Sequence, residues 1–250
     1  MPIRLKAFGL HMLLSMTLIT VYLTFVFFVW YQDPYYKIYD TWAAIKIVVG
    51  VDLIIGPLLT LIVFDIAKKR SVLVRDIAVI IIVQISALSW GVHVTYSVRP
   101  LFSVFHEGTF YLFSQQDVDV SRMADKTLIP AFWQSATYVY VNPPKDKDEY
   151  NHIYANLIDA NERPDVMYLT ERYLPLNEIR EKVNESAINL TNALNNNDKK
   201  QMVDNFLKDR KTTINECSFY SIKGGNKHAS IVFDKQNGLK IGYIDAILEY

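Results

Sequence analysis

The feature that most constrains this chain is an apolar run, residues 43–64, that contains an aspartate and a Gly-Pro step. The run is long enough to cross a bilayer as one helix. A carboxyl group at the bilayer centre costs about 3 kcal/mol on insertion scales, so Asp52 needs a compensating contact. Pro57 has no N–H to donate to the carbonyl of Leu53, which predicts a kink one turn beyond Asp52.

One face of this expected helix is small and polar. Asp52, Gly56 and Thr60 are spaced four residues apart, so they share a face, with Pro57 beside them. Small residues let membrane helices pack closely, whereas the Leu, Ile and Val positions favour lipid. We therefore expect the Asp52 face to contact another helix.

Two further apolar runs, residues 7–30 and 77–98, also have the length of membrane spans. The first is longer than the apolar region of a secretory signal and ends in Trp30-Tyr31, which predicts an uncleaved helix. The loop that follows is rich in Tyr and Trp, as is typical of an aromatic belt at a membrane boundary. The sequence thus predicts three transmembrane helices.

The basic residues predict the orientation of these helices. Arg4 and Lys6 precede the first span and four basic residues lie between the second and third, whereas the Tyr-rich loop has only Lys37. The positive-inside rule then predicts a cytoplasmic N-terminus. We expect residues 1–98 to form a transmembrane domain in a bacterial inner membrane and residues 99–250 to form a periplasmic domain.

Composition excludes several classes of protein. The formal net charge is +3 over residues 1–98 and −3 over residues 99–250, without the basic excess of a nucleic-acid binder. The single cysteine, Cys217, excludes an intrachain disulfide, a CxxC redox pair and a cysteine-based zinc site.

Residues 99–250 have the pattern of an α+β domain with helices packed on an antiparallel sheet. Apolar periodicity predicts three helices, at 145–160, 176–194 and 198–211. Runs of β-branched and aromatic residues predict strands at 100–113, 132–141, 217–222, 228–233 and 239–248. Glu107-Gly108 and Asn237-Gly238 are the expected turns.

Signatures of catalysis are missing. The chain has no HExxH, GxSxG or P-loop motif, and its histidines lack the spacing of metal ligands. Ser89 and His93 lie four residues apart and could be a nucleophile and a base, but no oxyanion hole or third orienting group accompanies them. We expect a packing role for this pair, and no catalytic residue, metal or cofactor.

Asp52 has two interpretations. Gln84, Ser89 and His93 supply polar groups on the third helix, and Ser89 is expected at the depth of Asp52. A hydrogen-bonded Asp52 would lock the second and third helices together. Alternatively, Asp52 is a polar docking point for the transmembrane helix of a partner.

The run GVDLIIGPLLTLIVF at residues 50–64 resembles the type IV pilin accessory proteins of the TfpX/TfpZ type. The similarity extends over most of residues 1–100, including Phe27-Phe28-Val29-Trp30-Tyr31, Lys68-Lys69 and Arg99-Pro100, and is loose beyond. The resemblance implies a non-enzymatic inner-membrane protein that stabilises or assists assembly of one type IV major pilin. Such a pilin awaits assembly with an apolar helix in the membrane and a head in the periplasm. Membrane lipid and other pilus assembly proteins are further implied partners.

Two alternatives from other classes stay open. A membrane-anchored periplasmic sensor or ligand-binding protein would suit residues 99–250, although the predicted cytoplasmic segments are too short for an output domain. An intramembrane enzyme or transporter could use Asp52, although three helices are few for a pore.

Overall fold

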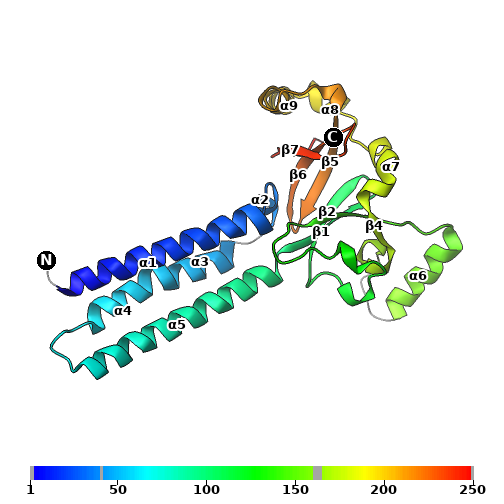
Figure 1. Ribbon diagram of the computed structural model, residues 1–250. Helices are drawn as coiled ribbons and strands as arrows, with labels where there is room; N and C mark the ends of the chain where they lie inside the picture. Colours follow the sequence, from blue (N-terminus) through cyan, green and yellow to red (C-terminus); the bar gives the residue numbers. More distant parts are fainter. Residues whose placement is uncertain (1–2, 40–41, 160–164, 249–250) are drawn as a thin grey trace. The chain divides into compact units, whose positions relative to one another are not determined.

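A computed structural model describes residues 3–39, 42–159 and 165–248 of the chain. The chain forms two compact units (Figure 1). The helical unit comprises Met1–Val29 and Asp40–Arg99, and the sheet unit comprises Trp30–Tyr39 and Pro100–Tyr250.

The helical unit contains three segments long and apolar enough to cross a membrane, Ile3–Trp30, Ile45–Val63 and Arg70–Ser97. This confirms the three predicted apolar helices. Their elements are α1 (Ile3–Phe25) with a π-helical turn at Val26–Trp30, α3 (Trp42–Gly50), a second π-helical turn at Val51–Ile55, α4 (Gly56–Val63) and α5 (Arg70–Ser97). The middle span packs against both neighbours, α1 and α5.

The irregularity expected near Pro57 takes the form of the π-helical turn that carries Asp52. Pro57 cannot donate a backbone hydrogen bond, so regular α-helical bonding cannot continue through it. The Gly56 N–H donates instead to the carbonyl of Val51, five residues earlier. Turns of this kind are frequent at functional sites.

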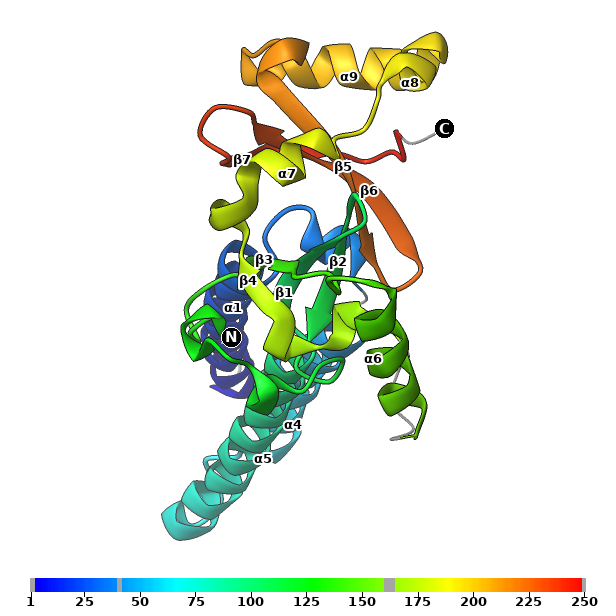
Figure 2. The same ribbon diagram turned by 90° about the vertical axis from the view of Figure 1, so that its right-hand side faces the viewer.

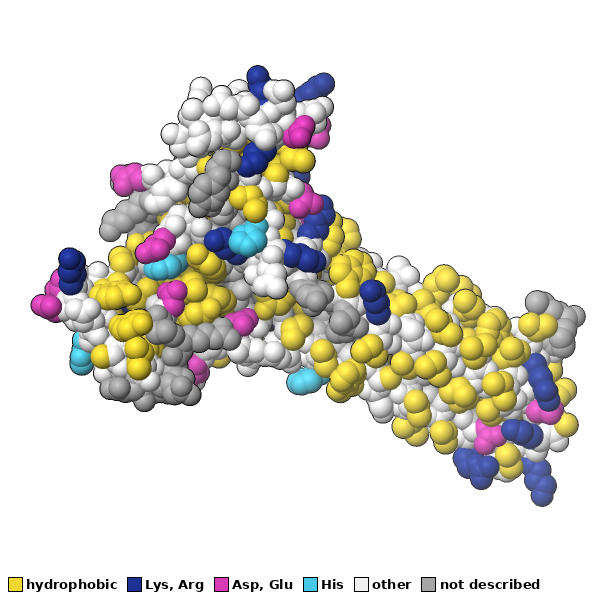
Figure 3. Space-filling view, turned by 180° about the vertical axis from the view of Figure 1, so that it is seen from behind, with side chains coloured by type: hydrophobic (Ala, Val, Ile, Leu, Met, Phe, Trp, Pro, Cys, Tyr) yellow, Lys and Arg dark blue, Asp and Glu magenta, His cyan; other side chains and the backbone are white. Residues whose placement is uncertain are grey.

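The surface of the helical unit matches the sequence pattern. Figure 3 shows apolar side chains covering it, with basic side chains gathered at one end. Arg4 is paired there with Asp65, and Lys68 with Asp76 at 2.8 Å between Nζ and Oδ2. The start of α1 and the loop between α4 and α5 therefore lie at the same end of this unit.

The sheet unit is built on seven strands in the order β4-β3-β1-β2-β5-β6-β7. They are β1 (Pro100–His106), β2 (Thr109–Ser114), β3 (Thr137–Val141), β4 (Tyr173–Pro175), β5 (Cys217–Gly224), β6 (Lys227–Asp234) and β7 (Lys240–Ile244). The α+β class is confirmed, but the sheet is mixed, because β1 pairs with β3 and β2 pairs with β5 in parallel. Other helices and strands lie between the two strands of each parallel pair in the sequence. The alternation of residues along a strand does not show which strand pairs with it.

The turns follow the sequence closely. Glu107 and Gly108 both have positive φ, 46° and 78°, as in a two-residue hairpin turn. Asn237-Gly238 lies in a longer connection, residues 235–239, where Gly238 has a φ of 69°.

Two of the three helices expected in residues 99–250 form as predicted. They are α6 (Lys147–Asp159), with residue 160 outside the described residues, and α9 (Asn197–Arg210). The side chain of Asn196 caps α9 by accepting from the backbone N–H groups of Asp198 and Lys199. The predicted helix at 176–194 is wrong as one element: it consists of a 3-10 turn (Leu176–Ile179), α7 (Arg180–Glu185) and α8 (Thr191–Asn195). Successive side chains of each strand point to opposite faces of the sheet. Val183 of α7 belongs to the core cluster on one face, and residues of α6, α8 and α9 belong to the clusters on the other face. Figure 2 shows α8 and α9 at the opposite end of the sheet unit from α6.

The segment Trp30–Tyr39 belongs to the sheet unit. It contains α2 (Tyr35–Ile38), whose Tyr35 and Ile38 are buried in a core cluster with Phe110 and Tyr220. The Tyr35 hydroxyl donates to the Tyr138 hydroxyl at 2.9 Å. The sequence predicts an aromatic loop at the membrane boundary for this segment. In the structure, its buried apolar side chains pack against the sheet.

This buried tyrosine predicts the behaviour of the sheet unit at high pH. Burial raises the pKa of Tyr35 to about 12, whereas an unfolded tyrosine has a pKa of about 10. Above about pH 10 the unfolded chain loses this proton first, so the free energy of unfolding falls by up to about 1.4 kcal/mol per pH unit until pH reaches the folded pKa. Calorimetry of the full chain in detergent from pH 9 to 12 measures this slope. Burial also raises the pKa of Tyr39, Tyr138 and Tyr173, which add their own slopes. Tyr35→Phe should therefore make the total slope shallower and the exposed Tyr150→Phe should not; equal slopes in both variants would contradict the role of Tyr35.

Candidate functional site

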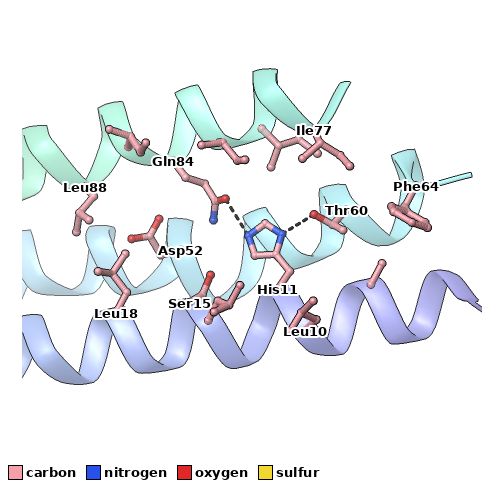
Figure 4. A pocket seen from close by; sticks show the side chains of 15 residues that line it. Leu10, His11, Ser15, Leu18, Asp52, Thr60, Phe64, Ile77, Gln84 and Leu88 are labelled. Carbon is pink, nitrogen blue, oxygen red and sulfur yellow. Dashed lines mark hydrogen bonds between the residues drawn. The ribbon is translucent and has the colours of Figure 1, made fainter. Parts of the chain in front are cut away.

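An elongated groove lies within the helical unit, between α1 and α5, with the middle span contributing its floor (Figure 4). Its volume is about 380 Å³. The lining residues run from Ala7 to Leu18 on α1 and from Ile77 to Leu88 on α5, a length of about 16 Å at the rise of an α-helix. Three residues come from the middle span, namely Asp52, Thr60 and Phe64. Most of the lining is apolar, and its polar side chains come from all three spans: His11 and Ser15 on α1, Asp52 and Thr60 on the middle span, and Gln84 on α5.

A histidine links all three spans across this groove. His11 Nδ1 lies 2.5 Å from the Thr60 hydroxyl, and His11 Nε2 lies 2.8 Å from Gln84 Oε1. An amide oxygen only accepts, so in the neutral imidazole Nε2 donates to Gln84 and Nδ1 accepts from Thr60. Both ring nitrogens are thereby satisfied inside the unit.

Asp52 is buried beside this network without joining it. The residue is 3% exposed, and its Oδ2 atom has no hydrogen-bond partner among the described residues. Figure 4 places its carboxyl group near Gln84, pointing into the groove. A buried acceptor without a donor costs about 1–3 kcal/mol. The groove therefore has one strong hydrogen-bonding group to offer to whatever fills it.

The Gln84 side chain packs against Gly56, in the space that a side chain at residue 56 would occupy. A Cβ atom at residue 56 would lie 2.0 Å from Gln84 Nε2, so any larger residue there would displace the Gln84 amide. Close approach of a polar side chain to a glycine backbone is the packing expected of small residues in membrane helices.

The structure brings some of the predicted residues together and separates others. Asp52, Thr60 and Gln84 line the groove, Gly56 contacts Gln84, and Pro57 is buried one residue further on. Ser89 and His93 are exposed on α5 and do not line the groove. The polar residue of α5 that lies nearest in the groove to Asp52 is Gln84, because the helices are set with Ser89 turned outward.

Sequence reasoning gave no role to His11 or Ser15, which both line the groove. A single histidine near the end of a span is most simply interpreted as a polar residue at the membrane interface. This interpretation gives no reason to place His11 in a groove between helices. The available signal was its spacing: His11 and Ser15 are four residues apart on one face of α1, and the same face carries Tyr22, whose hydroxyl lies 2.8 Å from the Thr95 hydroxyl on α5.

The sheet unit has hollows of its own. One, of about 380 Å³, is lined by aromatic side chains of the sheet, by α7 and by Lys240. Burial lowers the pKa of Lys240, whose Nζ donates to the carbonyl of Asp33 at 2.8 Å. This is the hollow that a ligand-binding protein would use. No group of three His, Cys, Asp or Glu residues that could hold a metal ion occurs in the described parts of the chain.

Comparisons with known proteins point to one family. A sequence model of the family described as Fimbrial assembly protein FimB matches residues 1–39. The fimbrial assembly protein of serogroups C1 and C2 from Dichelobacter nodosus is 34% identical over 113 residues, which are 45% of this chain and 86% of that protein. The serogroup I and serogroup E1 proteins of the same organism are also 34% identical over 113 residues, but the match covers only 44% of each. No solved structure matches the chain.

Three helices long and apolar enough to cross a membrane, followed by a folded sheet unit, are compatible with a membrane-anchored protein. The chain belongs to the fimbrial assembly protein FimB family, and its role is in type IV fimbrial assembly. The narrower TfpX/TfpZ assignment stays a prediction.

The network predicts the effect of removing Gln84. Gln84→Leu leaves the Nε2–H group of His11 without an acceptor among apolar side chains, which should destabilise the helical unit by about 1–3 kcal/mol. Thermal unfolding of the purified protein in detergent measures the loss. Ser89→Leu, a matched change at an exposed position on the same helix, should leave the melting temperature unchanged. Equal effects of the two substitutions would contradict a bonded His11–Gln84 pair.

Proposed function

We propose that this protein stabilises one type IV pilin subunit before assembly, by holding the apolar helix of that subunit in the groove between α1 and α5. The observation that carries the proposal is the Asp52 oxygen without a partner among the described residues, in a mostly apolar groove where His11, Thr60 and Gln84 bond to one another. The proposal includes the TfpX/TfpZ-type assignment, an inner-membrane location and a non-enzymatic mode of action.

The elongated shape of the groove along the spans suits a row of side chains from a helix. A volume of about 380 Å³ is too small for a whole helix but accepts a row of its side chains. The groove runs along the spans for about 16 Å, or about three turns of a helix. Helices in bundles pack with the side-chain ridges of one helix in the grooves of its neighbour, so a third helix could lay a row of side chains along this groove.

Asp52 supplies selectivity in this arrangement. Lipid chains cannot donate a hydrogen bond, so lipid in the groove leaves the carboxyl oxygen unsatisfied. A helix with one donor at the depth of Asp52 satisfies it and gains over purely apolar helices. We infer that the matching pilin presents such a donor.

The proposed topology places a second contact at the membrane surface. The basic end of the helical unit, near Arg4 and Lys68, would face the cytoplasm, and the sheet unit would face the periplasm and the pilin head. Two modest contacts on one scaffold give a higher avidity than either alone. Lipid and other fimbrial assembly proteins are the further partners proposed.

Filling the groove tests the proposal. Ile81 lines the groove, and its neighbour Ile82 is 63% exposed and does not. Ile81→Trp should lower the amount of membrane-held pilin and the number of surface fimbriae several-fold, because the indole occupies the space of the pilin side chains. Ile82→Trp, with the same added bulk on the lipid side, should leave both unchanged.

A second substitution separates recognition from stability. Asp52→Leu removes the unpaired carboxyl, so the protein itself should be as abundant as the parent or more so, while pilin levels fall. Asp52→Asn keeps an acceptor oxygen and should retain part of the activity. Immunoblots of both proteins and fimbriae counts are the readout; normal fimbriae in Ile81→Trp and Asp52→Leu together would overturn the proposal.

A further inference from the structure

The loop before β3 carries the most exposed large apolar side chain among the described residues of the sheet unit. Trp133 is 72% exposed and its neighbour Phe132 is 46% exposed. The surrounding segment, residues 130–135, contains no charged residue. An aromatic pair on an uncharged loop is unusual on a surface that meets only water, and marks an interaction surface.

This loop is fixed to the end of the first span. The indole Nε1–H of Trp30 donates to the carbonyl of Phe132 at 2.6 Å, and the two rings meet edge to face with centroids 5.1 Å apart. Trp30 is 1% exposed, and it is the last residue of the apolar span Ile3–Trp30. Phe132 therefore contacts the residue at which this span ends.

We infer that residues 131–133 form a membrane-surface anchor, with the Trp133 and Phe132 side chains inserted into the headgroup region of the bilayer. Tryptophan is enriched at this depth because its ring has an apolar body and a polar N–H group. The occupant of the surface is thus a phospholipid interface. Residues 130–135 contain no charged side chain, so inserting this loop into the bilayer does not require the costly transfer of a charge out of water.

The backbone already connects the first span to the sheet unit at Trp30, and the anchor adds a contact between the sheet unit and lipid. Apolar side chains sunk about 5–10 Å into the interface restrain the element that carries them. The loop would therefore hold the sheet unit at the membrane surface without any fimbrial partner. This inference stands independently of the proposed function, since it concerns lipid alone.

Spin labelling of the full chain in nanodiscs of phosphatidylethanolamine and phosphatidylglycerol tests the anchor. One label replaces Trp133 through Trp133→Cys. A matched label replaces Met202 through Met202→Cys, an exposed apolar site (45%) on α9, which packs against β7. The native Cys217 is 2% exposed, and the unmutated chain gives its background.

The label at 133 should be relaxed by oxygen several-fold more than by a water-soluble nickel complex, relative to the label at 202. A label at 133 as accessible to nickel as that at 202 would overturn the inference. Trp133→Phe provides a second measurement without a label. The tryptophan emission that this substitution removes should be quenched by lipids brominated near the headgroup and shielded from acrylamide. Quenching by acrylamide alone would equally overturn the anchor.

Discussion

The helical unit depends on how polar side chains between apolar helices satisfy one another, because lipid offers no hydrogen-bond partner. His11 solves this by donating to Gln84 and accepting from Thr60, which joins one residue from each span. Gly56 makes the arrangement possible, since any side chain there would displace Gln84. The Asp52 oxygen stays outside this network and has no hydrogen-bond partner among the described residues, which is why the proposed function assigns it to the partner helix.

The connections between the two units are short, which matters for a protein that is proposed to engage its partner at two levels. The first span runs into Trp30–Tyr39, whose Tyr35 and Ile38 are core residues of the sheet unit. The third span ends at Ser97 and β1 begins at Pro100. Short connections keep the effective concentration of the second contact high once the first has formed.

Much of this fold could be predicted because local patterns carry it. Apolar length predicts the three spans, and the Glu107-Gly108 dipeptide predicts the β1–β2 turn. The parallel pairs β1–β3 and β2–β5 could not be predicted, because they join segments distant in sequence and depend on burial of both faces. For the same reason Trp30–Tyr39 resembles a boundary loop in the sequence, although tertiary packing ties it to the sheet.

Only some of the residues that line the groove could be predicted from the sequence. Asp52, Gly56 and Thr60 could be placed on one face by their spacing, but which residue of α5 meets them depends on the rotation of that helix. Ser89, which was expected at the depth of Asp52, is exposed and does not line the groove, whereas Gln84 lines it. The spacing of His11 and Ser15 indicates a shared polar face of α1, but it does not show that Thr60 and Gln84 on the other two spans meet His11.

Photo-crosslinking in cells tests occupancy of the groove most directly. A probe at Leu10 on α1, which lines the groove, is compared with a probe at Leu13, which does not and is exposed to a similar extent (60% and 62%). If the groove holds a pilin helix, the probe at 10 forms an adduct with the pilin and the probe at 13 does not. Equal labelling at the two positions, or no pilin adduct at 10 while the protein is present at its normal level, would contradict the groove as the site of pilin binding.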